Sequence, residues 1–264
     1  MSLRRSDLQA LAKQLRVDLA PASVKLAMTW TSTILKAAVA DGLIRHNPAS
    51  GVRVPPVVLE RADPLPLATV AAVAESIDER YRAIVWFGAG TGVRISEALG
   101  LTVDRINFLK RQVRIDRQLI RDRGPVPEWG PVKDRHGRAR TIPLAQPTLD
   151  MLSAHIAQYG TGPEGLVFTG HRGGPVGKTE FTTAFRKAAG PLGLAPGKGF
   201  HQLRHTYASV LIAAGESVKT VQDRLGHASA VMTLDVYGHL WPEDEERTRQ
   251  AVETAFGAVD RTTG

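Results

Sequence analysis

The residues best suited to chemistry are concentrated in one short stretch of the chain. Four of the eight histidines lie between positions 201 and 239, together with Arg204, Tyr207 and Tyr237. Imidazole, guanidinium and phenol groups can together move protons, hold an anion and attack an electrophile. Such a cluster of titratable side chains is typical of an active site.

A zinc hydrolase is one chemistry to consider. His201 and His205 are four positions apart, so on a helix they share a face, and that spacing can hold zinc. The zinc protease pattern also needs a glutamate directly after the first histidine as general base, and this position is Gln202. No nearby acid clearly offers a third ligand. The spacing therefore gives a zinc hydrolase little support.

Residues 174–179, GPVGKT, imitate a phosphate-binding loop. The pattern requires four residues between its two glycines, which would place the first glycine where the chain has Arg172. Gly173 is one residue too close, and Pro175 removes a backbone N–H from the cradle. We interpret this segment as an ordinary loop rather than as an ATP site.

A third candidate is TGVRISEALGL, at positions 91–101. Arg94 follows a glycine at the start of a predicted helix, and Glu97, three residues further on, is close enough to orient its guanidinium. Alone, an exposed ion pair on a helix surface would be the better interpretation. The segments that follow along the chain change this interpretation of Arg94 and Glu97.

Five segments occur in a fixed order. TGVRISEALGL is followed by PVKDRHGRARTIPL (131–144), FHQLRHTYAS (200–209), RLGHAS (224–229) and TLDVYGHL (233–240). In these segments and their order, the chain resembles the tyrosine recombinase family, the phage-type integrases. The resemblance covers residues 64–264, about three-quarters of the chain, and five ordered motifs are far more specific than any one of them.

The resemblance implies a set of active-site residues, motif by motif. No position of the core set is substituted, which favours an active enzyme. The implied catalytic residues are Arg94, Lys133, His201, Arg204, His227 and Tyr237. Glu97 and His205 are supporting residues, and for His205 we expect local packing. Arg135 and Arg138 are alternatives to Lys133, because hairpin turns vary in length.

The implied reaction is strand exchange in DNA through a 3'-phosphotyrosyl intermediate. Tyr237 would attack phosphorus, and because a free phenol has a pKa of about 10 it needs a base, which His201 or a neighbour would provide. The phosphotyrosyl bond would conserve the energy for rejoining the strands.

Cationic side chains would stabilise the transition state and protonate the leaving group. Arg94 and Arg204 would clamp the non-bridging phosphate oxygens in the transition state, and His227 would donate a further hydrogen bond. Lys133 would protonate the leaving deoxyribose oxygen. The resemblance therefore implies neither a metal ion nor a nucleotide cofactor.

The composition suits a nucleic-acid partner. Lys and Arg number 34 against 26 Asp and Glu, a net charge of +8, and the segment 94–140 alone carries twelve basic and six acidic residues. The absence of cysteine excludes a disulfide scaffold, a thiolate metal site and a cysteine nucleophile. No apolar run approaches the ~20 residues of a membrane helix. We expect a DNA-associated protein of the bacterial cytoplasm that does not interact with membranes.

The elements that position these residues are predicted to be mostly α-helices with a small antiparallel β-sheet. Apolar spacing predicts helices over 22–40, 67–76, 80–88, 95–99, 149–158, 180–189, 202–214, 218–225 and 243–258. Short strands are predicted at 106–108, 113–115 and 140–144. The resemblance implies the integrase catalytic fold preceded by a short helical core-binding domain.

We expect four parts in the chain. Residues 1–54 form a helical core-type DNA-binding domain, 55–63 a linker with paired prolines, 64–242 the catalytic domain and 243–264 a helical tail. The family's core-binding domain usually has about four helices, so the first part is apparently shortened. Its basic residues suit phosphate contacts: Arg4, Arg5, Lys13, Lys25 and Lys36.

The implied assembly is a homotetramer on paired sites in double-stranded DNA, each protomer closing as a C-shaped clamp. Accessory DNA-bending or directionality proteins are further expected partners. The tail would either pack on its own catalytic domain or dock on a neighbouring protomer. Two alternatives stay open: a catalytically silent or truncated DNA-binding relative, and a DNA-relaxing enzyme similar to type IB topoisomerases.

Overall fold

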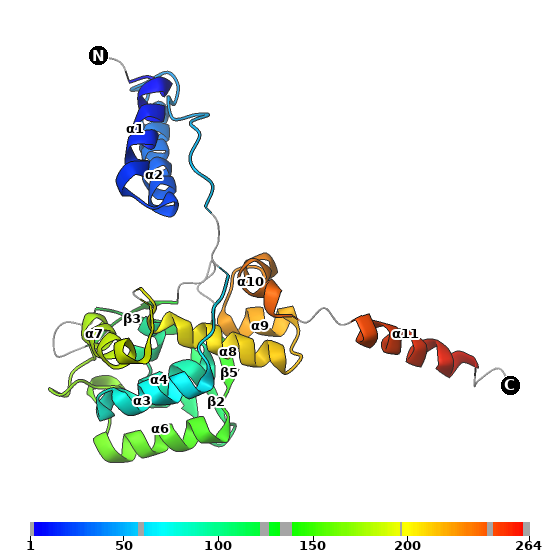
Figure 1. Ribbon diagram of the computed structural model, residues 1–264. Helices are drawn as coiled ribbons and strands as arrows, with labels where there is room; N and C mark the ends of the chain where they lie inside the picture. Colours follow the sequence, from blue (N-terminus) through cyan, green and yellow to red (C-terminus); the bar gives the residue numbers. More distant parts are fainter. Residues whose placement is uncertain are drawn as a thin grey trace. The chain divides into compact units, whose positions relative to one another are not determined.

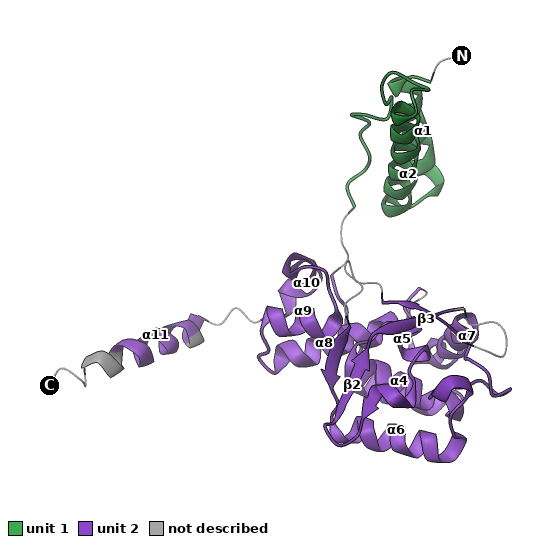
Figure 2. Cartoon of the chain, turned by 180° about the vertical axis from the view of Figure 1, so that it is seen from behind, with its two compact units in different colours: residues 1–60 green, residues 61–264 purple. Residues whose placement is uncertain are grey.

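The computed structural model describes residues 3–57, 61–121, 127–132, 139–195, 197–241 and 245–260. The chain divides into two compact units, residues 1–60 and 61–264 (Figure 2). The division falls within the segment expected to be the linker. None of the helices in the described ranges is long and apolar enough to cross a membrane.

The first unit is a pair of helices that lie side by side, α1 (Arg5–Asp18) and α2 (Pro21–Ala40) (Figure 1). Pro21 occupies the first turn of α2, where a missing backbone N–H costs nothing. Partly buried apolar side chains surround the core of this unit. The core itself consists of four buried side chains: Leu8, Ala12, Val24 and Met28.

The second unit contains the remaining helices and all the strands of the described chain. Its longer helices in chain order are α3 (Leu67–Ser76), α4 (Glu79–Thr91), α6 (Gln146–Tyr159), α7 (Lys178–Ala189), α8 (His201–Ala213) and α11 (Glu245–Asp260). Its short helices are α5 (Ile95–Leu99), α9 (Val218–Leu225) and α10 (Ala230–Tyr237). The expectation of a mostly helical fold with a small antiparallel sheet is confirmed.

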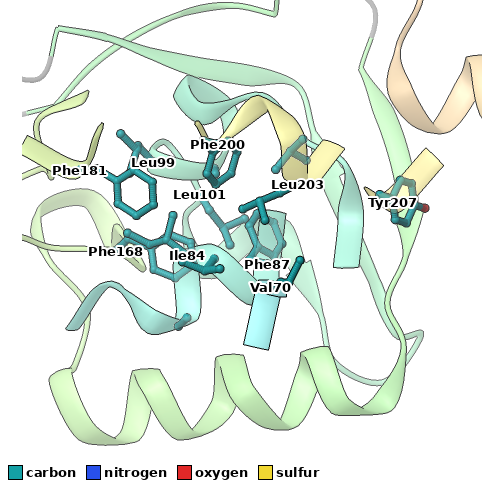
Figure 3. Packing of buried hydrophobic residues seen from close by; sticks show 14 of the residues in the cluster. Val70, Ile84, Phe87, Leu99, Leu101, Phe168, Phe181, Phe200, Leu203 and Tyr207 are labelled. Carbon is teal, nitrogen blue, oxygen red and sulfur yellow. The ribbon is translucent and has the colours of Figure 1, made fainter. Parts of the chain in front are cut away.

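The core of the second unit lies among α3, α4, α7 and α8 (Figure 3). Phe87 and Phe168 are in ring contact, with centroids 5.9 Å apart. Helices α4 and α8 approach closely at Gly88, where a Cβ atom would come within 2.5 Å of the Phe200 ring. This close packing fixes α8, which carries much of the predicted active site, against the body of the unit.

Two small antiparallel sheets lie beside the helices. Strands β1 (Ile106–Asn107), β2 (Gln112–Ile115) and β5 (Arg140–Pro143) form one sheet in the order β1-β2-β5. These correspond to the three predicted strands. Strands β3 (Arg117–Arg121) and β4 (Glu128–Pro131) form a second sheet that the sequence analysis did not anticipate. They lack a clear alternation of apolar residues, and the Arg117 guanidinium lies 4.2 Å from the centroid of the Trp129 ring.

Helices α8, α9 and α10 follow one another in the chain and pack together (Figure 1). Ser229 caps the N-terminus of α10, its hydroxyl accepting a hydrogen bond from the Met232 N–H. Tyr237 is the last residue of α10, so the helix end fixes its position. Sequence analysis missed this helix, because its eight residues include two β-branched valines and show little amphipathic spacing.

Candidate active site

The segment around Arg94 is shaped by a glycine. Gly92 ends α4 in the left-handed conformation, with φ of 64°, and a Cβ atom there would lie 2.4 Å from the Tyr207 ring. Arg94 then occupies the N-cap position of α5. Its backbone N–H and its Nη1 both donate to the Glu97 carboxylate, at 2.9 and 3.1 Å. The predicted Arg94–Glu97 pair is therefore present, with Glu97 buried.

Glu97 has a second cationic partner. The guanidinium of Arg140, on β5, donates from Nη2 to Oε2 at 2.5 Å and from Nη1 to Oε1 at 3.2 Å. Burial raises the pKa of Glu97, but the hydrogen bonds and charges of Arg140 and Arg94 outweigh it, so the pKa lies below its ordinary value. The carboxylate is thus ionised at neutral pH and bridges two guanidiniums.

Arg204 is the buried cation of the site, with 1% of its surface exposed. It extends from α8 and donates from Nη1 to the Gly92 carbonyl and from Nη2 to the Leu225 carbonyl, both at 2.7 Å. These two bonds join α8 to the end of α4 and the end of α9. Burial and the nearby Arg94 lower the pKa of Arg204, but a guanidinium stays protonated at neutral pH.

Tyr237 points into the same cluster and is 1% exposed. Its hydroxyl lies 2.9 Å from Nδ1 of His205. Burial raises the pKa of Tyr237 to about 12, although the positive charge of Arg204 acts in the opposite direction. His205 was expected to serve local packing, but the structure places it in direct contact with the tyrosine hydroxyl.

Two further histidines surround this pair. The ring of His201 contacts that of His205, with centroids 4.7 Å apart. The ring of His227 stacks on Tyr237 at a centroid distance of 6.1 Å, and its Nδ1 lies 2.9 Å from the Thr233 hydroxyl. His201, His205 and His227 are therefore brought together, as the clustering in the sequence suggested.

The half-buried histidines His205 and His227 are held neutral. Burial, with the positive charges of His201 and Arg204, lowers the pKa of His205 to about 4. Burial and the charges of Arg204 and Arg94 lower the pKa of His227 to about 3. At neutral pH both rings therefore have one nitrogen that can accept a proton and one that can donate a hydrogen bond.

Some residues that the sequence analysis named are not part of this cluster in the structure. His239 contacts the Ala62 carbonyl at 3.0 Å, and Tyr207 is a core residue of the second unit. Lys133 and its alternatives Arg135 and Arg138 lie outside the described residues. Within the described ranges, no group of three or more His, Asp or Glu side chains could hold a metal ion, so the His201–His205 spacing gains no third ligand there.

Arg140 is the member of the cluster that sequence analysis missed. A signal was available: the alternation of a strand places Arg140 on the same face as Ile142, which is fully buried. An arginine on a buried face requires an anionic partner. Its partner, Glu97, is 43 positions away in the chain, and only the fold brings them together.

Comparisons with known proteins identify the family of this chain. The family model described as the phage integrase family matches residues 65–243. The tyrosine recombinase XerC of Bradyrhizobium diazoefficiens is 27% identical over 272 residues, covering 96% of this chain and 78% of the relative. XerC of Mycobacterium bovis is 31% identical over 221 residues, which cover 77% of this chain and 67% of that relative. The chain spans 66% of the XerC-like protein of Caldanaerobacter subterraneus.

Solved structures show the same fold. The Tn1549 transposon integrase in complex with transposon right end DNA has a TM-score of 0.79 at 22% identity, covering 97% of this chain and 86% of that one. A lambda integrase tetramer bound to a Holliday junction has a TM-score of 0.68 at 19% identity. The match covers 87% of this chain and 65% of the lambda integrase chain.

The fold and the family match define a tyrosine-type site-specific recombinase. The chain belongs to the phage integrase family. Both the family and the enzyme class predicted from the five ordered motifs are confirmed.

Proposed function

We propose that this protein recombines double-stranded DNA by cutting and rejoining strands through a phosphodiester bond to Tyr237. The observation that carries the proposal is the Tyr237 hydroxyl, 2.9 Å from Nδ1 of His205 in a cluster that also holds the buried Arg204 guanidinium. A nucleophile, a proton acceptor and a cation for phosphate are thus in one place.

The proposed reaction begins with attack of the Tyr237 oxygen on phosphorus. The new oxygen–phosphorus bond forms as the bond from phosphorus to the 5'-oxygen breaks, which leaves a 3'-phosphotyrosyl link. The phenolic proton passes to a neutral histidine, and His205 is the one in hydrogen-bond distance. The reverse attack by a 5'-hydroxyl rejoins the strand and releases the tyrosine.

Arg94 and Arg204 are proposed to hold the phosphate. A guanidinium has five N–H donors, and the two carbonyl bonds of Arg204 anchor it while other N–H groups remain for phosphate oxygens. Arg94 is 26% exposed at its side chain and can meet DNA directly. His227 is proposed to donate a further bond, and Lys133 to protonate the leaving 5'-oxygen.

The proposed partner is duplex DNA, with a homotetramer on paired sites. The net charge of +8 favours a polyanion, and the lambda integrase tetramer bound to a Holliday junction shares the fold. In this proposal residues 1–54 contribute DNA contacts, and the protein works on DNA in the bacterial cytoplasm. DNA-bending or directionality proteins would act as accessory factors.

The tail, 243–264, is proposed to dock on a neighbouring protomer. Within α11, Val252 and Phe256 are 53% and 71% exposed. The second unit has an apolar cavity of about 800 Å³ whose lining includes Trp86, Met151 and Leu211. This cavity is the proposed acceptor for the apolar face of the tail on an adjacent protomer.

A covalent trap tests the function. We would incubate the protein with a pool of nicked duplexes of randomised sequence and recover adducts that resist denaturation. The wild type is expected to form adducts, also in EDTA, with DNA mapped to Tyr237 by peptide mass spectrometry. Tyr237→Phe is expected to bind DNA and form no adduct. Tyr207→Phe is the matched control, because it removes the hydroxyl of another buried tyrosine.

The outcomes separate the alternatives. A silent DNA-binding relative would bind and form no adduct, and adducts at another tyrosine would overturn the assignment of Tyr237. An enzyme similar to type IB topoisomerases would form the adduct and relax supercoiled plasmid without joining two sites. Recombinant products from two paired sites are the expected result.

A further inference from the structure

One arginine outside the predicted active-site set contacts two of its segments. Arg140 begins β5, and its side chain is 9% exposed. Besides its two bonds to Glu97, its Nε donates to the Arg224 carbonyl near the end of α9, at 2.9 Å. A single planar guanidinium thus links β5, α5 and α9 through three hydrogen bonds of fixed geometry.

The carboxylate that Arg140 holds is the one that holds Arg94. Glu97 accepts the Arg94 backbone N–H on Oε2, the same oxygen that receives the 2.5 Å bond from Arg140. The Glu97 side chain is 0% exposed, so its position depends on these two cations rather than on water. Arg140 therefore influences where Glu97, and through it Arg94, is placed.

The turn that carries His227 is in contact with the same side chain. Gly226 lies at φ of 66°, and a Cβ atom there would be 3.0 Å from Nη1 of Arg140. The Gly226 carbonyl also accepts a 3.4 Å bond from Nη2 of Arg94. The glycine lets the turn approach both guanidiniums closely, so the segment before His227 is positioned by Arg140 and Arg94 together.

We infer that Arg140 is a positioning residue for DNA cleavage, which shares the Glu97 carboxylate with Arg94 and joins the Arg94 segment to the turn before His227. The inference rests on the proposed function. Because Arg140 takes part of the carboxylate's charge, Arg94 is oriented by Glu97 without being fully neutralised by it. Without Arg140, Arg94 becomes the sole cationic partner of Glu97 among the described residues and has less charge available for phosphate.

Single-turnover cleavage is the first test. Arg140→Met removes the charge. Arg140→Lys keeps the charge but cannot form the paired hydrogen bonds that the guanidinium makes to the Glu97 carboxylate. We expect Arg140→Met to lose about a hundred-fold in the rate of adduct formation, as misplacement of a reacting group does, and Arg140→Lys to recover only part of it. DNA affinity should change little. Arg114→Met is the matched control, since Arg114 lies on the neighbouring strand β2 with a 63% exposed side chain.

The pH profile separates positioning from general damage to the fold. In Arg140→Met the pKa of Glu97 should rise, because the hydrogen bond and charge that lower it are lost while burial still raises it. The cleavage rate of this variant should therefore fall further as the pH drops below neutrality, more steeply than in the wild type. Adding Glu97→Gln should abolish that extra pH dependence, because no carboxylate is left to protonate.

A measurement without DNA tests the positioning by Arg140 separately from the proposed reaction. Amide hydrogen exchange of Arg94 reports how firmly Glu97 holds its N–H. We expect Arg140→Met to exchange about ten-fold faster at this amide and Arg114→Met to leave it unchanged. If wild-type protein forms no adduct, the proposed function fails while exchange still tests the positioning. Unchanged Arg94 exchange in Arg140→Met, or cleavage at the wild-type rate, would overturn the inference.

Discussion

Nδ1 of His205 lies 2.9 Å from the hydroxyl oxygen of Tyr237, 32 positions further along the chain. The contact joins α8 to the last residue of α10 and holds the tyrosine inside the site. Because the His205 ring is neutral at neutral pH, its geometry and protonation state both suit acceptance of the phenolic proton. The motif comparison gave that task to His201 or a neighbour, and His205 is the histidine within hydrogen-bond distance of the hydroxyl.

The first prediction concerns His205 as proton acceptor. His205→Asn should slow adduct formation about a hundred-fold, the typical contribution of a general base, and leave duplex binding intact. The rate of covalent trapping on nicked duplexes is the measurement. His171→Asn is the control, because it removes a 62% exposed histidine that pairs with Asp78.

A direct comparison with His201 decides between the two histidines. If His201→Asn abolishes trapping while His205→Asn cleaves at the wild-type rate, the proton passes to His201 and the 2.9 Å contact only orients the tyrosine.

The second prediction concerns stability against pH. The pKa values of His205 and His227 are lowered by burial to about 4 and about 3, below the ordinary value of about 6.5. The unfolded chain therefore binds more protons as the pH falls below about 6.5, so the free energy of unfolding should decrease from there down to about 3. Urea unfolding midpoints across this range provide the measurement.

A double variant isolates this effect from other groups. His205→Phe with His227→Phe should flatten the decline, because neither position then takes up a proton on unfolding. An equally steep decline in the double variant would assign the acid sensitivity to other residues.

The third prediction concerns the leaving group. If Lys133 is the general acid, Lys133→Ala should cleave normal DNA slowly and recover on DNA whose leaving 5'-oxygen is replaced by sulfur, since a thiolate leaves without protonation. Arg94→Ala should not recover on that DNA, because its proposed task is to stabilise charge on the non-bridging oxygens. Rescue of Arg135→Ala or Arg138→Ala in place of Lys133→Ala would move the role to that residue.

The fourth prediction concerns Arg204, which is both catalytic and structural in this scheme. Arg204→Met should abolish trapping and also lower the free energy of unfolding by about 2–3 kcal/mol. The reason is that the Gly92 and Leu225 carbonyls lose charged donors at 2.7 Å in a buried site. Chemical unfolding measures this loss. Stability equal to the wild type would mean that water replaces both bonds.

Much of this fold follows from local sequence. Apolar spacing predicts 67–76, 95–99 and 218–225, and α3, α5 and α9 have the same bounds. Helix α10 and strands β3 and β4 cannot be predicted from the local sequence, because their sequences have weak periodicity and they form through packing on neighbouring elements.

The candidate active site likewise has residues that the sequence predicts and contacts that it does not. Ordered motifs name Arg94, Arg204 and Tyr237, since each lies in a short segment with recognisable neighbours. The Arg140–Glu97 pair and the His205–Tyr237 contact join segments 43 and 32 positions apart. Such contacts depend on how α5, α8, α10 and β5 are placed in three dimensions, which residue spacing does not specify.

The last prediction concerns the tail. The apolar side chains of α11 recur at helical spacing, and Val252 and Phe256 are exposed. The segment 241–260 carries six acidic and two basic residues, so its charge suits a basic protein surface and disfavours phosphate. Deleting everything after Pro242 should therefore leave binding to a single site largely intact and prevent assembly on paired sites. Cleavage should change as well, because the tail begins a few residues after Tyr237.

Counting protomers per paired-site complex by mass photometry measures the effect. Val252→Ser with Phe256→Ser should reproduce the truncation, because the pair removes the apolar anchors and keeps the acidic residues. Leu109→Ser is the control, since it removes an apolar side chain that is 98% exposed in the second unit. Head-to-tail docking of this kind closes into a ring, so losing one contact type should stop every copy from assembling. Tetramers and recombination at the full-length rate from the truncated protein would show that the tail is dispensable or packs on its own protomer.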